Sequence, residues 1–311
     1  MPLQISTQTR REALALAAGI ALAAPLGSAA VAAVPADDLS GPWTGGGDIS
    51  TVGGKLHYAT LGPDGGEPLV LLPKLGGWIA DWRFAAADLA KTRRVIAFDL
   101  PGHGGSIMAA PPPYVVSVPE IAAMILAALD EMRIDRCAFG GNSLGGVVGI
   151  VAAACWPERV SKLVIVSSSL IGAMTREAVF AQDHAAPDPN APSSYTKAGE
   201  PLPPTAEQNR LFGTMDPRVI REQALSRAKA GLWLRSCERG VGRGGVTDYL
   251  PRIKAPTLMI NADRGRYVKY IDVGKRLIPN VQAVVIPQAG SFVHQEKPAE
   301  VARAMNAFLD G

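Results

Sequence analysis

The sequence predicts an α/β fold, in which a mostly parallel central sheet carries helices on both faces. Short runs that are entirely apolar, such as 69–72 and 163–166, are typical of parallel strands buried on both faces. Patterns with helical spacing alternate with these runs along most of the chain. The length of 311 residues is sufficient for one large domain with a buried core.

The first half of the chain supplies five expected strands in order. Helical patterns separate them, and the strongest begins at Val118, with Pro119 in its first turn, where proline is tolerated. The expected strands are 55–59, 69–72, 94–98, 137–139 and 163–166, and the expected helices are 81–90, 118–132 and 146–155.

The regular alternation is interrupted by an insertion at about 170–248. It contains a proline-rich segment, 187–204, followed by helical patterns over 218–234. We expect it to form a cap over the carboxyl ends of the strands, where α/β sheets bind ligands. A loose linker is the alternative, but Trp233 and its two leucine neighbours favour at least partial packing. Strands at 257–260 and 283–286 and helices at 270–277 and 298–309 complete a domain that spans 37–311.

Residues 1–36 have the layout of an export signal. Arg10 and Arg11 lie in a polar n-region, an apolar segment rich in Ala and Leu spans 13–26, and small residues follow up to Ala36. The paired arginines indicate the twin-arginine export machinery as a partner, and hence a periplasmic or secreted protein. A permanent membrane anchor is the alternative, which the short, alanine-rich apolar run disfavours.

The composition argues against several classes of function. The net charge of +3, which falls to +2 when the leader's two arginines and one glutamate are removed, is too small to indicate nucleic acid or an anionic membrane as a partner. The four histidines are scattered without metal-ligand spacing, so no metal and no other cofactor is expected. Cys137, Cys155 and Cys237 allow at most one internal disulfide, and the first two lie in apolar segments typical of a core.

A nucleophile motif lies where an apolar strand meets an apolar helix. Residues 141–145 read Gly-Asn-Ser-Leu-Gly and match G-x-S-x-G, with Ser143 at the centre. The motif is short enough to occur by chance. Its context is what the chemistry requires, because the serine must stand on a tight turn between small neighbours. The N-terminus of the following helix would present the Leu144 N–H to a developing oxyanion.

Over nearly the whole mature length, the chain resembles the α/β-hydrolase superfamily. Residues 99–106 are similar to the family's D-x-P-G-x-G-x-S turn, 253–258 to its I-x-x-P-T-L approach to the penultimate strand, and 292–300 to the start of its final helix. The resemblance implies an α/β-hydrolase fold and a triad in the order Ser, acid, His.

The positions of the acid and the base depart from the family pattern. Gly265 stands where the acid is expected, and Asp263 is the candidate replacement, with a solvated loop aspartate as the alternative. Ser291 follows Gly290 where the family has Gly-His. The candidate base is therefore His294, three residues later, and a surface or capping histidine is the alternative.

The loop after the strand 69–72 is expected to complete the oxyanion site. The Leu75 N–H is the candidate second donor, and Lys74 replaces a small residue of the family loop. We expect Lys74 to face solvent, whereas a buried Lys74 would add positive charge to the oxyanion site. His103 lies in the 99–106 turn, where the family's histidine is structural.

These features predict a serine hydrolase whose substrate is a small ester, lactone or related carbonyl compound. Ser143 attacks, His294 acts as the base and Asp263 orients it. Leu75 and Leu144 hold the oxyanion. One alternative is a non-hydrolytic protein that binds a small molecule in the same pocket. The other is a lyase or isomerase that does not use the triad, because a fold alone does not decide the chemistry.

Overall fold

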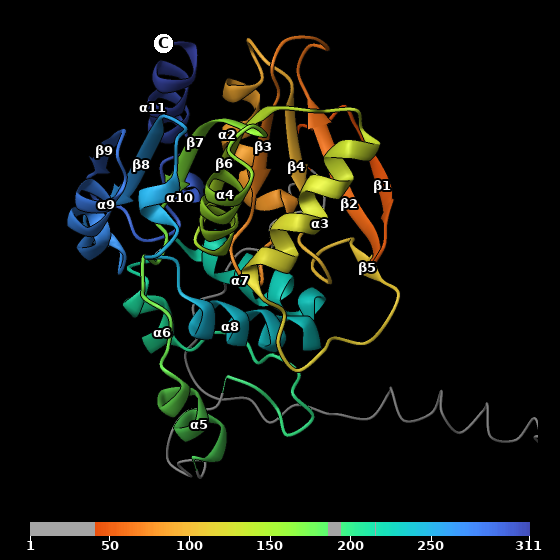
Figure 1. The fold of residues 1–311 in the computed structure, drawn as a ribbon, viewed down its shortest axis with the longest axis vertical. Helices are drawn as coiled ribbons and strands as arrows, with labels where there is room; N and C mark the ends of the chain where they lie inside the picture. The colour runs from red at the N-terminus through yellow and green to blue at the C-terminus, as the bar shows by residue number, and fades with distance from the viewer. Residues whose placement is uncertain (1–40, 186–193, 215) are drawn as a thin grey trace, which may run out of the picture. The chain divides into compact units, whose positions relative to one another are not determined.

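A computed structural model describes residues 41–185, 194–214 and 216–311, so the predicted export signal lies outside the described residues. Nine strands of this part form one sheet in the order β1-β2-β4-β3-β6-β7-β8-β9, with β5 paired to β2 off that path (Figure 1). The pairs β1–β2, β2–β4 and β2–β5 are antiparallel, and the pairs from β4 through to β9 are parallel. This mixed, mostly parallel sheet confirms the predicted fold class.

The strands and helices have the following bounds. The strands are β1 (Gly45–Thr51), β2 (Gly54–Leu61), β3 (Leu69–Leu72), β4 (Val95–Phe98), β5 (Ile107–Met108), β6 (Cys137–Asn142), β7 (Val160–Val166), β8 (Thr257–Ala262) and β9 (Val281–Ile286). The helices of the sheet layers are η2 (Ile79–Trp82), α2 (Arg83–Leu89), α3 (Val118–Glu131), α4 (Leu144–Cys155), η3 (Leu250–Arg252), η4 (Val268–Tyr270), α9 (Ile271–Leu277), α10 (Val293–Glu296) and α11 (Pro298–Asp310). Between β7 and β8 lie α5 (Arg176–His184), α6 (Ala206–Leu211), α7 (Pro217–Ala230) and α8 (Leu232–Gly244).

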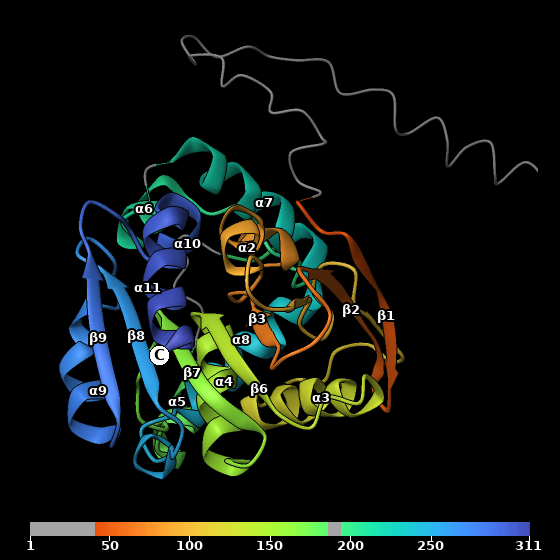
Figure 2. The same ribbon diagram turned by 90° about the horizontal axis from the view of Figure 1, so that it is seen from above.

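Two helical layers cover the sheet because its central strands are apolar on both sides. In β3, Val70 and Leu72 join the core that includes α3 and α4. Leu69 and Leu71 join the core on the other face, which includes α2 and α11 (Figure 2). All four side chains are fully buried. The side chains therefore alternate between the two layers, as a pleated strand requires.

Helix α3 begins where the sequence predicts. The Ser117 side chain accepts a hydrogen bond from the Glu120 N–H, and the Glu120 carboxylate accepts one from the Ser117 N–H. The Ser117 side chain thus satisfies an N–H group that the helix itself leaves free, and Pro119 in the first turn has no N–H that would need a partner.

Helices α7 and α8 of the insertion pack on the loops that follow β3 and β4. A Cβ atom added to Gly76 would lie 2.4 Å from Leu234 of α8, and one added to Gly102 would lie 2.0 Å from Trp233. These close approaches agree with the expectation that Trp233 packs. They bring the insertion against loops at the carboxyl ends of the parallel strands. The loop after β3 also borders the nucleophile turn, since a Cβ on Gly145 would lie 2.7 Å from the Pro73 oxygen.

A buried ion pair joins α7 to α2. Glu222 accepts a hydrogen bond of 2.8 Å from Nη1 of Arg83, and a second, shorter bond joins Nη2 to the other carboxylate oxygen. Both side chains are 2% exposed. Such a bidentate pair combines charge with fixed geometry, and breaking it would leave a charge buried without a partner.

Strand β1 is one of the elements that the sequence did not predict. Its residues read Gly-Gly-Gly-Asp-Ile-Ser-Thr and pair in register with β2 along the edge of the sheet. Glycine carries no side chain that could reveal an alternating pattern, so the strand is defined by its partner rather than by its own periodicity.

The three cysteines are free thiols in this structure. Burial raises the pKa of Cys137 and of Cys237 to about 12. Cys155 is half-buried and packs against the same core. Within the described ranges, no helix combines the length and the apolar character that crossing a bilayer requires.

Candidate active site

Ser143 stands on a strained turn between β6 and α4. Its φ of 51° and ψ of −112° are unusual for a residue with a side chain, and such a conformation costs about 1–3 kcal/mol unless the surroundings enforce it. A Cβ on Gly141 would lie 2.2 Å from the carbonyl carbon of Gly145, and one on Gly145 would lie 2.3 Å from the Leu72 oxygen. The two glycines therefore let strand and helix approach closely enough to form a nucleophile elbow.

Asn142, the residue before the nucleophile, ties the elbow to the loop after β9. Its side-chain nitrogen donates to the Val166 oxygen at 3.0 Å and to the Ser291 oxygen at 3.1 Å. The Ser143 N–H also donates to the Val166 oxygen, at 3.0 Å. These bonds fix the strained backbone from two sides.

The hydroxyl of Tyr267 lies 3.3 Å from Oγ of Ser143. Tyr267 is 8% exposed, and Asn261 donates to its backbone oxygen at 3.0 Å, which anchors the loop after β8. Burial raises the pKa of the Tyr267 phenol above its usual value. The group beside the nucleophile is therefore a neutral phenol, which can donate one hydrogen bond and accept another.

Sequence reasoning missed Tyr267. The feature of the sequence that could have indicated Tyr267 is its position in the loop after the penultimate strand, at the edge of the sheet where ligands bind. Spacing drew attention to Gly265 and Asp263 of the same loop instead.

His294 is fully buried on α10 and forms no hydrogen bond with Ser143. Its ring packs against Trp82, with 4.5 Å between the ring centroids. Neither ring nitrogen has a hydrogen-bond partner among the described residues. Burial, with a smaller contribution from the charge of Lys74, holds the pKa of His294 well below its usual value. The imidazole is therefore neutral, and it is neither at the surface nor paired with an acid.

Asp263 lies on the solvent-exposed turn after β8. The Ala289 N–H donates to its carboxylate at 3.4 Å. Hydrogen bonding from the Gln288 N–H, followed by smaller contributions that include the Ala289 N–H, lowers the pKa of Asp263. These contacts make Asp263 a partner of backbone groups in its own turn. The structure does not bring Asp263 into hydrogen-bond contact with His294.

The positions that the family pattern reserves for acid and base are adjacent in space. A Cβ on Gly265 would lie 3.2 Å from the Ser291 nitrogen and 3.3 Å from its Cα. Ser291 is fully buried, and its hydroxyl accepts a hydrogen bond of 3.0 Å from the Arg266 N–H. Gly265 and Ser291 therefore lie next to each other in the structure.

Leu75 and Leu144 lie where oxyanion donors are expected. Leu144 is the first residue of α4, so its N–H has no acceptor within the helix. Leu75 lines the same cavity as Ser143. Whether their N–H groups hold an oxyanion stays a prediction.

The expectation that Lys74 faces solvent is wrong, because Lys74 is only 5% exposed. Its ammonium group donates to Asp81 at 2.7 Å and lies 5.2 Å from the centroid of the Phe292 ring. Burial raises the pKa of Asp81, and the charge of Lys74 opposes that shift. The carboxylate explains how a lysine is accommodated there.

His103 is structural, as the resemblance implied. It is fully buried, one ring nitrogen lies 2.9 Å from the Pro101 oxygen, and burial lowers its pKa to about 4. Asp99 holds the same turn by accepting hydrogen bonds from the N–H groups of Ile79 and Gly105, both at 2.7 Å.

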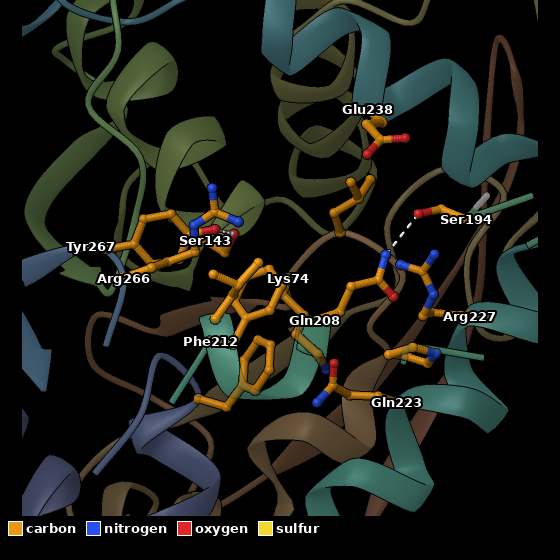
Figure 3. Close-up of a pocket in the computed structure, with 14 residues that line it drawn as sticks. Lys74, Ser143, Ser194, Gln208, Phe212, Gln223, Arg227, Glu238, Arg266 and Tyr267 are labelled. Atoms are coloured by element: carbon orange, nitrogen blue, oxygen red, sulfur yellow. Dashed lines mark hydrogen bonds between the residues drawn. The ribbon is translucent and has the colours of Figure 1, made fainter. Parts of the chain in front are cut away.

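A cavity of about 300 Å³ opens beside Ser143. Figure 3 shows Ser143, Tyr267 and Arg266 on one side of it and Ser194, Gln223 and Arg227 on the other. Side chains from the insertion and from the sheet loops contribute to its lining, which comprises Lys74, Leu75, Ser143, Ser194, Pro204, Gln208, Leu211, Phe212, Gln223, Arg227, Glu238, Arg266, Tyr267 and Phe292. Within the described part of the chain, no three His, Cys, Asp or Glu residues gather in a group that could hold a metal ion.

Comparison with known proteins identifies relatives of this architecture. The model of the alpha/beta hydrolase family matches residues 69–304. The dihydrolipoyllysine-residue acetyltransferase component of the acetoin cleaving system of Pseudomonas putida is 29% identical over 284 residues, covering 88% of this chain and 71% of the relative. The esterase YbfF of Escherichia coli is 26% identical over 260 residues, covering 78% and 93%. Among solved structures, the carboxylesterase CesB of Bacillus subtilis superimposes with a TM-score of 0.68 at 21% identity, covering 88% of this chain and 94% of that one.

Proposed function

The chain belongs to the alpha/beta hydrolase family, and from this premise we propose that it is an exported serine hydrolase of a small ester, lactone or related carbonyl compound. The observation that carries the proposal is Ser143, held on a strained elbow and lining a cavity of about 300 Å³. The similarity to an esterase over most of both chains supports the ester class.

In the proposed mechanism, Tyr267 takes part in proton transfer in place of a histidine. As Oγ of Ser143 bonds to the substrate carbonyl carbon, its proton passes to the Tyr267 oxygen while the phenolic proton passes to the leaving-group oxygen, so the phenol never carries two protons. The bond between the leaving-group oxygen and the carbonyl carbon then breaks and releases the alcohol. Water attacks the acyl-enzyme with the same paired transfer: its proton passes to the Tyr267 oxygen, the phenolic proton passes to Oγ of Ser143, and the bond between Oγ and the carbonyl carbon breaks.

The oxyanion in this mechanism is held by backbone N–H groups. Those of Leu75 and Leu144 are the proposed donors, and the helix dipole of α4 adds to their effect. Lys74 lines the same cavity, but Asp81 at 2.7 Å offsets its charge, so we assign it a smaller part in holding the oxyanion.

The alternative within the same function keeps His294 as the base and Asp263 as its orienting acid. This alternative requires one hydrogen bond between Ser143 and His294 and another between His294 and Asp263, and the described structure contains neither. The hydrogen bond between Ser143 and Tyr267 is already in place, so we favour the tyrosine mechanism.

A second candidate function is binding of a small molecule without turnover. It is favoured by Gly265 and Ser291, which stand at the adjacent positions that a triad acid and base would use. Loss of the base in a serine triad lowers the rate by orders of magnitude. The cavity would remain suitable for a ligand.

Covalent labelling with a fluorophosphonate probe tests the two functions against each other. The wild-type protein is expected to be labelled, and the Ser143→Ala variant is not. A Ser168→Ala variant is the matched control, because Ser168 is a buried serine that does not line the cavity. If the folded wild type is not labelled and hydrolyses no p-nitrophenyl acetate, the hydrolase proposal is wrong and binding without turnover is favoured.

Export is proposed separately from catalysis. Arg10, Arg11 and the apolar segment that follows them support a twin-arginine signal and a periplasmic or secreted location. Cell fractionation tests this. We expect the wild type outside the cytoplasm and the Arg10→Lys/Arg11→Lys variant inside it, whereas equal distribution of the two would contradict the proposal.

A further inference from the structure

The cavity beside Ser143 carries more positive than negative charge. Its lining includes Lys74, Arg227 and Arg266 as cations and Glu238 as the only anion named in that lining. Lys74 is already paired with Asp81. Among these three cations, Arg227 and Arg266 are therefore the ones that could bind a negatively charged ligand.

Arg227 has no partner of its own within the described residues. Its guanidinium forms no hydrogen bond or ion pair there, and its Nε is buried without an acceptor. The stem of the side chain passes over the loop after β3, where a Cβ on Gly76 would lie 3.0 Å from Cγ of Arg227. No ion pair between Arg227 and Glu238 is present in the described part of the chain, and the Glu238 carboxylate accepts a hydrogen bond from Tyr195.

Gln223 lies one helical turn before Arg227, on the same face of α7. It is 5% exposed, and it lines the same cavity. Its Nε2 has no hydrogen-bond partner among the described residues. A buried amide donor without a partner is unfavourable and calls for an acceptor.

Arg266 differs from this pair. It is exposed, and its guanidinium lies 5.0 Å from the centroid of the Phe212 ring at the Ser143 side of the cavity (Figure 3). An exposed cation is solvated and screened, so it adds little selectivity. The half-buried Arg227, whose Nε is buried, and the buried Gln223 are therefore the stronger determinants of selectivity.

We propose that Arg227 and Gln223 bind a carboxylate group of the substrate, on the side of the cavity opposite Ser143. The guanidinium fork and the amide N–H group supply donors that match the two oxygens of a carboxylate. The substrate is then a small acyl ester with a free carboxylate distant from the reacting carbonyl. This inference rests on the proposed hydrolase function for its reacting bond, but not for the binding of the carboxylate.

The kinetic test compares two esters of equal acyl length, mono-p-nitrophenyl glutarate and p-nitrophenyl valerate. We expect the ratio of their kcat/KM values to fall by roughly tenfold or more in Arg227→Gln, because a hydrogen bond to a charged group is lost. Arg210→Gln is the matched control, since Arg210 is an exposed arginine of the insertion that does not line the cavity. An unchanged ratio in Arg227→Gln, or an equal fall in both variants, would overturn the inference.

A binding test does not depend on turnover. Calorimetry on Ser143→Ala should show monomethyl glutarate binding at least roughly tenfold more tightly than dimethyl glutarate, and adding Arg227→Gln should remove the difference. If the two esters bind alike, there is no carboxylate site, even if the wild type is an active hydrolase. If the preference is present while the wild type hydrolyses nothing, the hydrolase proposal fails and the carboxylate site stands.

Discussion

Replacing Tyr267 by phenylalanine removes the one side-chain group that is hydrogen-bonded to Ser143 in the described structure. Because a positioned proton donor and acceptor contributes about 10²–10⁴-fold, kcat/KM on p-nitrophenyl acetate should fall by that factor. At 1.36 kcal/mol per factor of ten, this is a loss of about 2.7–5.4 kcal/mol of transition-state stabilisation.

The stability of the Tyr267→Phe variant should change little. The distance of 3.3 Å between the two oxygens is long for an O–H···O bond. The bond therefore contributes at most about 0.5–1.5 kcal/mol to the free energy of unfolding. Urea denaturation measures this quantity, and it separates a catalytic effect from partial unfolding.

Two variants serve as controls for Tyr267→Phe. Tyr270→Phe removes a phenol whose ring lies 6.4 Å from that of Tyr267, outside the cavity lining, and should retain activity. His294→Phe keeps a ring against Trp82 and should also retain activity. The reasoning would be refuted if Tyr267→Phe stayed within about threefold of the wild type while His294→Phe lost two or more factors of ten, a loss typical of a missing base.

The pH profile gives an independent measurement of the same group. Burial raises the pKa of Tyr267 above its ordinary value of about 10, so Tyr267 keeps its proton throughout the neutral range. We expect kcat/KM to show no ionisation between about pH 6 and 9, because the pKa of Tyr267 is raised and that of His294 is held well below its usual value. An inflection in that range would show that a different ionising group takes part in proton transfer.

Three further predictions concern other parts of the molecule. The double variant Gly265→Asp/Ser291→His places an acid and a base at adjacent positions, and p-nitrophenyl acetate hydrolysis should rise by about 10²-fold or more if the added imidazole reaches the nucleophile. A decrease in a folded variant would show that these positions no longer face the nucleophile. Glu222→Gln leaves the charge of Arg83 buried without a counter-charge, so urea curves should show a loss of about 3–5 kcal/mol, and a loss below 1 kcal/mol would contradict this. Because the pKa of His103 is lowered to about 4, its contribution to stability is fully present above pH 6.5 and is lost as the pH falls towards 4, by about 1.36 kcal/mol per unit. The difference in unfolding free energy between wild type and His103→Asn should therefore shrink over this range, and a constant difference would contradict the assignment.

The sequence predicts the elbow well because its determinants are local. The motif consists of one continuous segment: a strand, the glycines at 141 and 145, and a helix. Its sequence pattern therefore predicts the turn on which Ser143 lies. Each strand predicted from an apolar run is present in the structure. A strand that is buried on both faces consists almost entirely of apolar residues, and such a run can be recognised in the sequence.

The partners of Ser143 are not predicted because they depend on contacts between distant segments. His294 forms no hydrogen bond with the nucleophile and packs instead on Trp82, more than two hundred residues earlier in the chain. Tyr267 approaches Ser143 through the fold of the loop after β8. Lys74 is buried because Asp81 lies beside it, and neither residue alone indicates this. Spacing along the sequence gives no measure of such distances.

The buried pair between Arg83 and Glu222 has a consequence for how molecules reach the cavity. Lifting α7 away from α2 would break both hydrogen bonds of this bidentate pair. We therefore expect α7 to stay in place while substrate enters and product leaves, and both molecules to pass on the side of the cavity that has no such ion pair.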